Sequence, residues 1–123
     1  MIITNNLKVK DHYAKVHKLL FVEGGYRDVL VTARDLVHKG HLLETHPLMG
    51  SLKPNETPYR SVIISDDSKA CTDSNSAMMI EDSILVFDKF AKIVRGDRGD
   101  QSTEKIKEDF REIDLSLIRS ALE

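Results

Sequence analysis

The side chains with the most chemical potential gather in one proline-rich stretch, residues 45–65, with the sequence THPLMGSLKPNETPYRSVIIS. Lys and Arg side chains on a stiff loop can hold an anion such as a carboxylate or phosphate. A histidine can transfer a proton near neutral pH. The stretch is therefore a candidate site for an anionic ligand or a partner. Its residues with suitable chemistry are His46, Lys53, Asn55, Glu56, Tyr59 and Arg60.

Backbone restraint explains part of this composition without any ligand. The stretch contains all 3 prolines of the chain. Proline fixes its own φ and favours extended backbone in the residue before it, here Lys53 and Thr57. Asn55 is suited to an Asx turn. An ordered surface loop with solvated charges is thus the alternative to a binding site.

The elements that must position this stretch follow from the spacing of apolar residues. Short β-branched and apolar runs predict strands at residues 1–5, 19–23, 41–45 and 61–65. Apolar residues at helical spacing predict helices over residues 11–20, 26–40, 76–95 and 106–121. Gly40 is a natural C-cap of the second helix, and Asp114 is suited to cap a separate final turn within the last one.

This order of elements predicts the fold class. Strands that alternate with helices favour a single three-layer α/β domain, a mostly parallel four-stranded sheet flanked by helices. A chain of 123 residues that is 41% hydrophobic suits one domain, residues 1–123, with one core. Whether strand 61–65 runs parallel to strand 41–45 stays open.

Strand ends add two residues to the candidate site. Ligands of open α/β sheets bind beyond the carboxyl ends of the strands. Asn5 and Asn6 follow the first predicted strand, and His46 follows the third. If these strands are parallel, we expect Asn5 and Asn6 to lie near the loop as further ligand- or partner-binding residues. Polar strand ends and helix caps are the simpler explanation.

Histidine and cysteine spacing gives no metal site. If His41 opens a strand and His46 follows it, about 16 Å separates them at ~3.3 Å per residue, too far for one zinc ion. His12 and His17 miss a common helix face. The single cysteine, Cys71, excludes an internal disulfide, a CxxC pair and a cysteine-cluster zinc site. We expect neither a metal nor a cofactor.

Charge and hydropathy argue against two classes of partner, nucleic acids and membranes, although the net charge leaves room for a local basic patch. The net charge is -2, from 18 basic and 20 acidic residues, which gives no sign of nucleic-acid binding. The sequence contains no signal peptide and no apolar run of the roughly 20 residues that a membrane helix needs. We therefore expect a cytoplasmic protein that binds neither nucleic acid nor membranes.

Three segments resemble the GrdX family. They are IITNN at residues 2–6, the whole of residues 24–65, and DFREIDLSLIRSAL at 109–122, with HKGHLLETHPLMGSLKPNETPYRSVII the most specific. Proteins of this family are encoded beside the glycine, sarcosine and betaine reductases of amino-acid-fermenting anaerobes, selenoprotein complexes that use thioredoxin-linked electrons. The resemblance implies an accessory role with a reductase component as partner. It carries over no catalytic residues.

Three functions remain open. The first is an accessory or binding protein of the reductase system, whose 45–60 loop presents a partner surface or holds a small anionic ligand. The second is a small-molecule enzyme on an anionic substrate, with His46 as general acid/base and Asn5, Asn6, Lys53 or Arg60 to hold the substrate. The third is an oligomer in which helix 76–95 pairs between chains. We favour the first.

Overall fold

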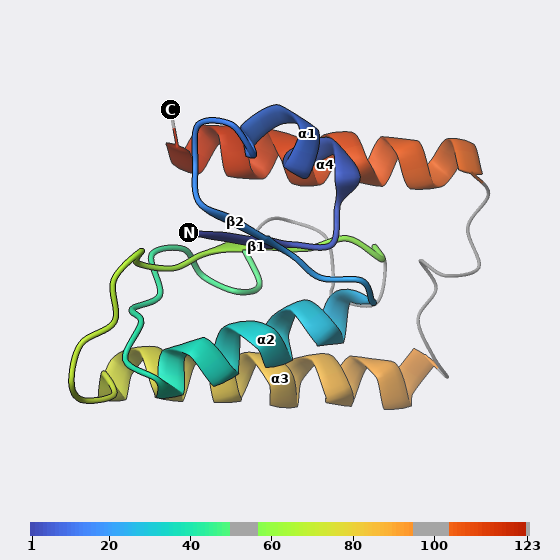
Figure 1. Cartoon of the computed structure of the whole chain (residues 1–123). Coiled ribbons are helices and arrows are strands. Elements are labelled where there is room, and N and C mark those ends of the chain that lie inside the picture. The colour runs from blue at the N-terminus through green and yellow to red at the C-terminus, as the bar shows by residue number, and fades with distance from the viewer. Residues whose placement is uncertain (50–56, 95–103, 123) are drawn as a thin grey trace.

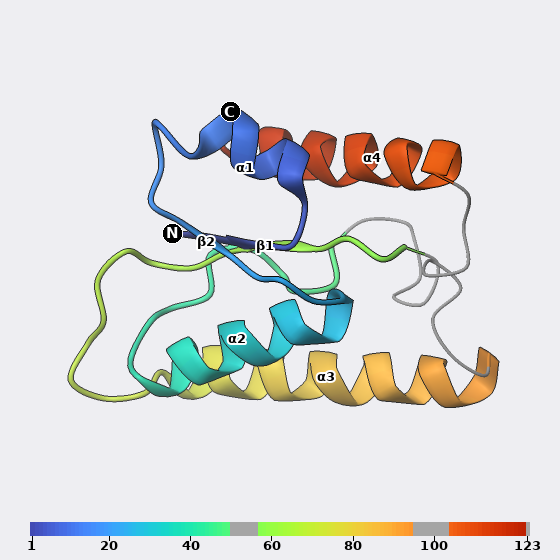
Figure 2. The ribbon, with the colours of Figure 1, turned by 45° about the vertical axis from the view of Figure 1, so that its right-hand side comes forward.

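A small sheet lies between two layers of helices in the computed structural model of the chain, which describes residues 1–49, 57–94 and 104–122 (Figure 1). Its strands are β1 (Ile2–Thr4), β2 (Leu19–Phe21) and β3 (Ser61–Ile63). Helices α1 (Leu7–Tyr13) and α4 (Glu104–Leu122) cover one face, and α2 (Tyr26–His38) and α3 (Ser74–Val94) cover the other. Figure 2 shows the same layers from a second direction. The predicted α/β class is confirmed.

The sheet differs from the prediction in strand number and direction. Within the described residues it has 3 strands in the order β2-β1-β3. β1 pairs in parallel with β2, where Ile3 lies opposite Leu20, and antiparallel with β3, where Ile3 lies opposite Val62. The prediction of a mostly parallel four-stranded sheet was therefore wrong, because the sheet is mixed and the 41–45 strand is missing.

Residues 41–45 form no strand, and their hydrogen bonds show why. Leu43 makes only an isolated antiparallel bridge with Ile64. The N–H groups of Glu44 and Thr45 both donate to the carbonyl of Ile63, at 2.8 and 3.3 Å. The N–H of Ile63 donates to the Thr45 hydroxyl at 3.0 Å, where a ladder would use a backbone carbonyl. In a regular antiparallel ladder, consecutive N–H groups do not donate to the same carbonyl. The backbone of residues 44 and 45 therefore departs from strand pairing.

Helix α1 begins earlier than the predicted 11–20 helix and ends at Tyr13. Asn6 is its N-cap, and the Asn6 side-chain oxygen accepts a hydrogen bond from the N–H of Lys8 at 3.0 Å. Asn is among the preferred N-cap residues, so the cap sets the start of the helix. The apolar residues beyond Tyr13 belong to β2 and to the segment that leads into it, and not to a helix.

The end of α2 follows the prediction for Gly40. Gly40 has φ 111°, a conformation that favours glycine. Its N–H donates to Val37 at 3.0 Å, and the N–H of His41 donates to Leu36 at 3.2 Å. These are the paired bonds of a Schellman cap. A Cβ at Gly40 would also lie 2.1 Å from the carbonyl oxygen of Lys69, so glycine is required on two counts.

Helix α4 runs unbroken through Asp114, so the predicted split of this helix was wrong. Asp114 does not cap a turn, because its side chain is buried and forms a hydrogen bond with Ser61 of the sheet.

No described helix is long and apolar enough to cross a membrane.

Two apolar clusters fill the spaces on the two faces of the sheet. Neighbouring residues of a strand point to opposite faces, so β1 and β3 each supply both clusters. Burial on both faces explains the unbroken β-branched run of β3. The cluster toward α2 and α3 contains Ile3, Tyr26, Val29, Leu30, Ala33, Val37, Val62, Ile64, Ile80, Ile84 and Phe87. The cluster toward α1 and α4 contains Ile2, Val9, Tyr13, Ile63, Leu115 and Ile118.

Candidate functional site

Three strand ends meet at one edge of the sheet because β3 runs antiparallel to β1. Asn5 and Asn6 follow β1, Gly24 follows β2, and Arg60 precedes β3. Ser65 follows β3 and therefore lies toward the opposite edge. A set of buried polar side chains, called here the polar cluster, occupies the first edge. It consists of Thr4, Asn5, Asn6, Arg60, Ser61 and Asp114.

Asp114 reaches this cluster from α4 and is 2% exposed. Its Oδ2 accepts hydrogen bonds from the Ser61 hydroxyl at 2.7 Å and from the Asn6 amide at 3.1 Å. Its Oδ1 lies 3.8 Å from Arg60 Nη2 and accepts no hydrogen bond within the described part of the chain. Burial raises the pKa of Asp114, and this effect outweighs the lowering by Arg60, Ser61 and Asn6.

Arg60 enters the same space from the start of β3 and is 3% exposed. Its Nη1 donates to the carbonyls of Pro47 and Met49, at 3.2 and 2.7 Å. Its Cζ lies 5.3 Å from the ring centroid of Tyr26. Among the described residues its Nε has no hydrogen-bond partner. Arg60 thus ties residues 47–49 to the sheet while one edge of its guanidinium makes no hydrogen bond there.

The two asparagines join backbone segments that are distant in sequence. The Asn5 amide nitrogen donates to the carbonyls of Gly24 and Pro58, at 3.0 and 2.8 Å, and its oxygen accepts from the N–H of Arg60 at 3.0 Å. The Asn6 amide nitrogen also donates to the carbonyl of Arg111 at 2.9 Å. Asn5 therefore connects the ends of the strands, and Asn6 connects α1 to α4.

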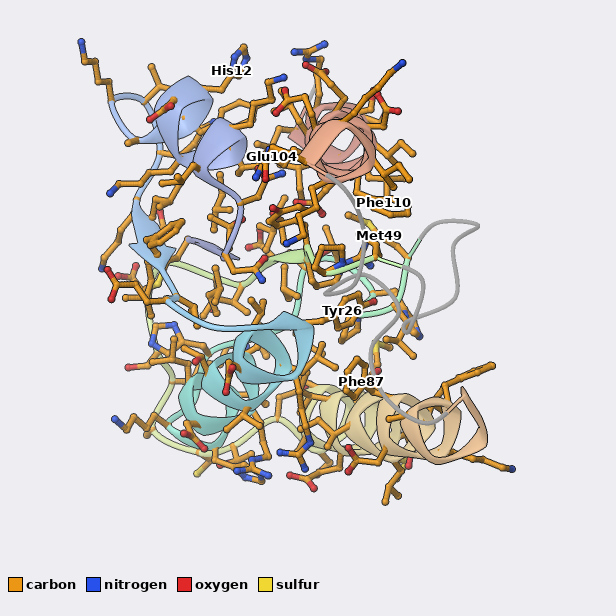
Figure 3. The ribbon with its side chains drawn as sticks, turned by 90° about the vertical axis from the view of Figure 1, so that its right-hand side faces the viewer. His12, Tyr26, Met49, Phe87, Glu104 and Phe110 are labelled. Carbon is orange, nitrogen blue, oxygen red and sulfur yellow. The ribbon has the colours of Figure 1, made fainter. Side chains whose placement is uncertain are left out.

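A cavity of about 40 Å³ lies beside the Arg60 and Asp114 side chains. Its other walls are mostly apolar and come from α4 and from the segments on either side of residues 50–56. Figure 3 shows two of them, Met49 and Phe110, between α4 and the sheet. The lining residues besides the charged pair are Met49, Thr57, Tyr59, Phe110, Ile113 and Leu117.

Tyr59 forms part of this wall and is half-buried. The Cζ of Arg111 lies 5.1 Å from its ring centroid, a cation–π distance. Arg111 in turn donates to Glu104 at 2.8 Å and to Glu108 at 2.9 Å. Tyr59 is thereby held against α4, where it lines the cavity.

His46 lies elsewhere, on the rim of an exposed groove of about 540 Å³ along α3. Its Nδ1 accepts a hydrogen bond from the N–H of Leu48 at 3.0 Å, so the neutral ring carries its proton on Nε2. We call this hollow the α3 groove. It is lined by His46, Leu48, Asn75, Met78, Met79, Asp82, Ser83 and Val86.

The predicted site residues therefore fall into separate places. The structure brings Asn5, Asn6 and Arg60 together in the polar cluster, with Tyr59 beside it. His46 lines the α3 groove, which Asn5 and Asn6 do not line. Lys53, Asn55 and Glu56 lie outside the described residues. No group of three or more His, Cys, Asp and Glu within the described ranges is arranged to hold a metal ion.

The sequence did not point to three members of the cluster, Thr4, Ser61 and Asp114, and Asp114 is the charged one among them. Phe110, Asp114 and Ile118 follow one another at helical spacing, so the carboxylate stands in a row that faces the protein interior. An acidic residue in the apolar row of a helix was the available signal, because buried carboxylates are rare unless they are paired.

Comparison with known proteins places the whole chain in one family. Residues 1–123 match the family described as GrdX-like protein. The comparisons with curated proteins and with solved structures found no match. Since the family match extends over the full length of the sequence, the chain belongs to the GrdX-like protein family.

Proposed function

We propose that the protein is an accessory protein of the glycine, sarcosine and betaine reductase systems, and that it acts by binding a partner protein at the α3 groove. Membership of the GrdX-like family supports the association with these reductases. The observation that carries the binding role is the groove itself, because large apolar side chains are exposed along it in the folded chain.

Four of the nine large apolar side chains that are exposed among the described residues lie on one helix, α3. Met78 and Leu85 of α3 are 65% and 67% exposed, and Met79 and Val86 are also exposed. Contiguous exposed apolar surface is typical of protein interaction sites. Methionine is flexible and polarisable, so a methionine-rich surface can adapt to the shape of a partner helix.

A carboxylate in the groove indicates the chemistry of the partner. Asp82 lines the groove and makes no ion pair with any described residue. Its neighbour Glu81 differs, because it lies 3.8 Å from Arg34 and 3.3 Å from His38. We therefore expect an amphipathic helix of the partner, with an apolar stripe against Met78 and Val86 and a Lys or Arg opposite Asp82.

The enzyme alternative gains no comparable support. It has His46 act on a substrate held by Asn5, Asn6, Lys53 or Arg60, and it requires His46 to lie close to Asn6. Asn6 instead caps α1 and bonds to α4, whereas His46 lines a groove on the α3 side. One observation supports an anion site on the 45–60 loop, namely the buried guanidinium of Arg60.

The test is a capture experiment with purified, tagged chain and an extract of a glycine-fermenting anaerobe, with the captured proteins identified by mass spectrometry. We expect a reductase component to be recovered. We expect the double variant Met78→Gln, Val86→Gln and the single variant Asp82→Lys to lose at least about tenfold of this capture. Val16→Ser is the matched control, because Val16 is an apolar residue 73% exposed that does not line the groove.

Three outcomes would overturn the proposal. Recovery of no reductase component contradicts the association. Equal capture by the groove variants and the native chain contradicts the role of the groove. A stable dimer in light scattering, dissociated by Met78→Gln with Val86→Gln, would show that a second copy of the chain occupies the groove instead.

A further inference from the structure

A second site, independent of the α3 groove, is built around the Arg60 and Asp114 side chains. We propose that the cavity beside them binds a small monocarboxylate of about two to four carbons, held by the guanidinium of Arg60 and by the carboxyl group of Asp114. This goes beyond the proposed function, because it uses other residues and a small ligand instead of a protein partner.

The unused edge of Arg60 is the first reason. Nη1 is occupied by the carbonyls of Pro47 and Met49, but Nε and Nη2 make no hydrogen bond with the described residues. These two nitrogens form the fork that matches the two oxygens of a carboxylate. A buried donor without a partner is rare and costs free energy, so a ligand that accepts from it is stabilised.

The free oxygen of Asp114 is the second reason. Its Oδ2 is held by Ser61 and Asn6, whereas Oδ1 is buried and makes no hydrogen bond in the described chain, and the Asp114 side chain lines the cavity. Two ionised carboxylates would repel each other in this space, but a protonated Asp114 donates a hydrogen bond to the ligand. Burial raises the pKa of Asp114, which favours the protonated form.

The charges then balance. Arg60 supplies one positive charge, the ligand one negative charge, and Asp114 is neutral after it takes up one proton from solvent. Two phenols also lie near Asp114: Tyr26 interacts with it, and Tyr59 lines the same cavity. Burial raises the pKa of Tyr26, so that phenol stays neutral. Binding of one carboxylate is thus coupled to the uptake of one proton.

Cavity size and lining set the class of ligand. A volume of about 40 Å³ exceeds the ~10–15 Å³ that one water molecule needs, but it is far too small for a nucleotide. Met49, Phe110, Ile113 and Leu117 offer an apolar wall to a short alkyl chain. Phosphate fits less well, because it has no apolar part and would place a second negative charge beside one guanidinium.

The first experiment titrates the purified full chain with acetate, propionate and butyrate and follows the Nε–H resonance of Arg60 by NMR. We expect a saturable shift of this resonance. Acetamide, which has the same shape as acetate but no charge, should bind at least about tenfold more weakly. Above the pKa of Asp114, carboxylate affinity should fall roughly tenfold per pH unit, since one proton is taken up on binding.

The second experiment separates this site from its surroundings. Asp114→Asn offers an amide N–H in place of the acid proton, so it should still bind propionate but lose the pH dependence. Asp109→Asn, an exposed carboxylate on the same helix, should change neither property. Met78→Gln, in the α3 groove, should also leave carboxylate binding unchanged, so this test does not depend on the partner protein.

Three results would overturn the inference. If no carboxylate produces a saturable shift at Arg60 with the native chain, the cavity holds water only. If acetamide binds as well as acetate, or if the affinity of the native chain does not change with pH, the ligand is not held as a carboxylate against a protonated Asp114. All three results come from the native chain, so they do not depend on the folding of a variant.

Discussion

The polar cluster and the α3 groove reverse the usual placement of side chains in opposite ways. In the polar cluster, Arg60 and Asp114 are buried although charged residues normally stay in water. In the α3 groove, Met78 and Met79 are exposed although large apolar residues normally pack inside. A buried charge costs several kcal/mol unless it is compensated, whereas an exposed methionine costs the fold little. Substitutions in the two regions should therefore differ most in their effect on stability.

The largest expected effect comes from Arg60→Ala. It leaves Asp114 as a buried carboxylate without its cation and removes the donor to Pro47 and Met49. We expect a loss of about 3–5 kcal/mol in the free energy of unfolding, measured by urea denaturation. The double variant Arg60→Met, Asp114→Leu should recover much of this loss, because it removes both charges. A loss below about 1 kcal/mol in Arg60→Ala would show that Asp114 does not depend on it.

Asn6→Ala should have the next largest effect. It removes the N-cap of α1 and the hydrogen bonds to Asp114 and to the Arg111 carbonyl. We expect about 2–3 kcal/mol of destabilisation in the same denaturation assay. Asn6→Asp is the informative control, because it keeps the cap but places a second carboxylate beside Asp114. If Asn6→Asp is as stable as the native chain at neutral pH, the amide donors contribute little.

The contrast between the regions also explains what sequence reasoning achieved. Apolar spacing and β-branched runs predicted the layers, the three strands and the turn at Gly40, because these depend on local pattern and burial. The direction of β3 was not predictable, since its sequence, SVI, fits a parallel or an antiparallel neighbour equally well. The prediction of a strand at 41–45 was wrong because the N–H groups of Glu44 and Thr45 donate to the same carbonyl. This arrangement depends on tertiary contacts that local sequence does not reveal.

The candidate site was predictable only in part for the same reason. Arg60 was identified by its charge within a proline-rich loop, and it lies in the polar cluster. Its inward orientation depends on Asp114, which is distant in sequence and reaches the sheet from α4. Likewise, nothing local relates His46 to Met78, because only the fold brings the 46–48 segment beside α3.

The pH dependence of the free energy of unfolding tests the polar cluster, because it reports on the buried carboxyl group of Asp114. The pKa of Asp114 is raised in the folded chain, so between its ordinary value of about 4 and the raised value the native state binds more protons than the unfolded state. Stability from this group is therefore lost as pH rises through that window, with a slope approaching about 1.4 kcal/mol per pH unit.

The control for this titration is Asp114→Asn, which should lack the slope. Glu108 and Asp73 have lowered pKa values, caused mainly by hydrogen bonds from Lys8 and from Ser76, and act with the opposite sign in more acidic solution. Because they are unchanged in the variant, the difference between the two unfolding curves isolates Asp114. Parallel curves across the whole range would contradict the raised pKa.

The smallest effect on stability is expected in the α3 groove. Met78→Gln keeps a long, unbranched side chain with good helix propensity at a largely exposed position. Its free energy of unfolding should stay within about 0.5 kcal/mol of the native value by urea denaturation, as should that of Val16→Ser. A loss of about 2 kcal/mol or more would mean that Met78 packs within the folded chain, so the groove would not be free to bind a partner. A stable variant that loses partner capture would instead separate the two regions cleanly, because side chains that the fold does not need would then be needed for binding.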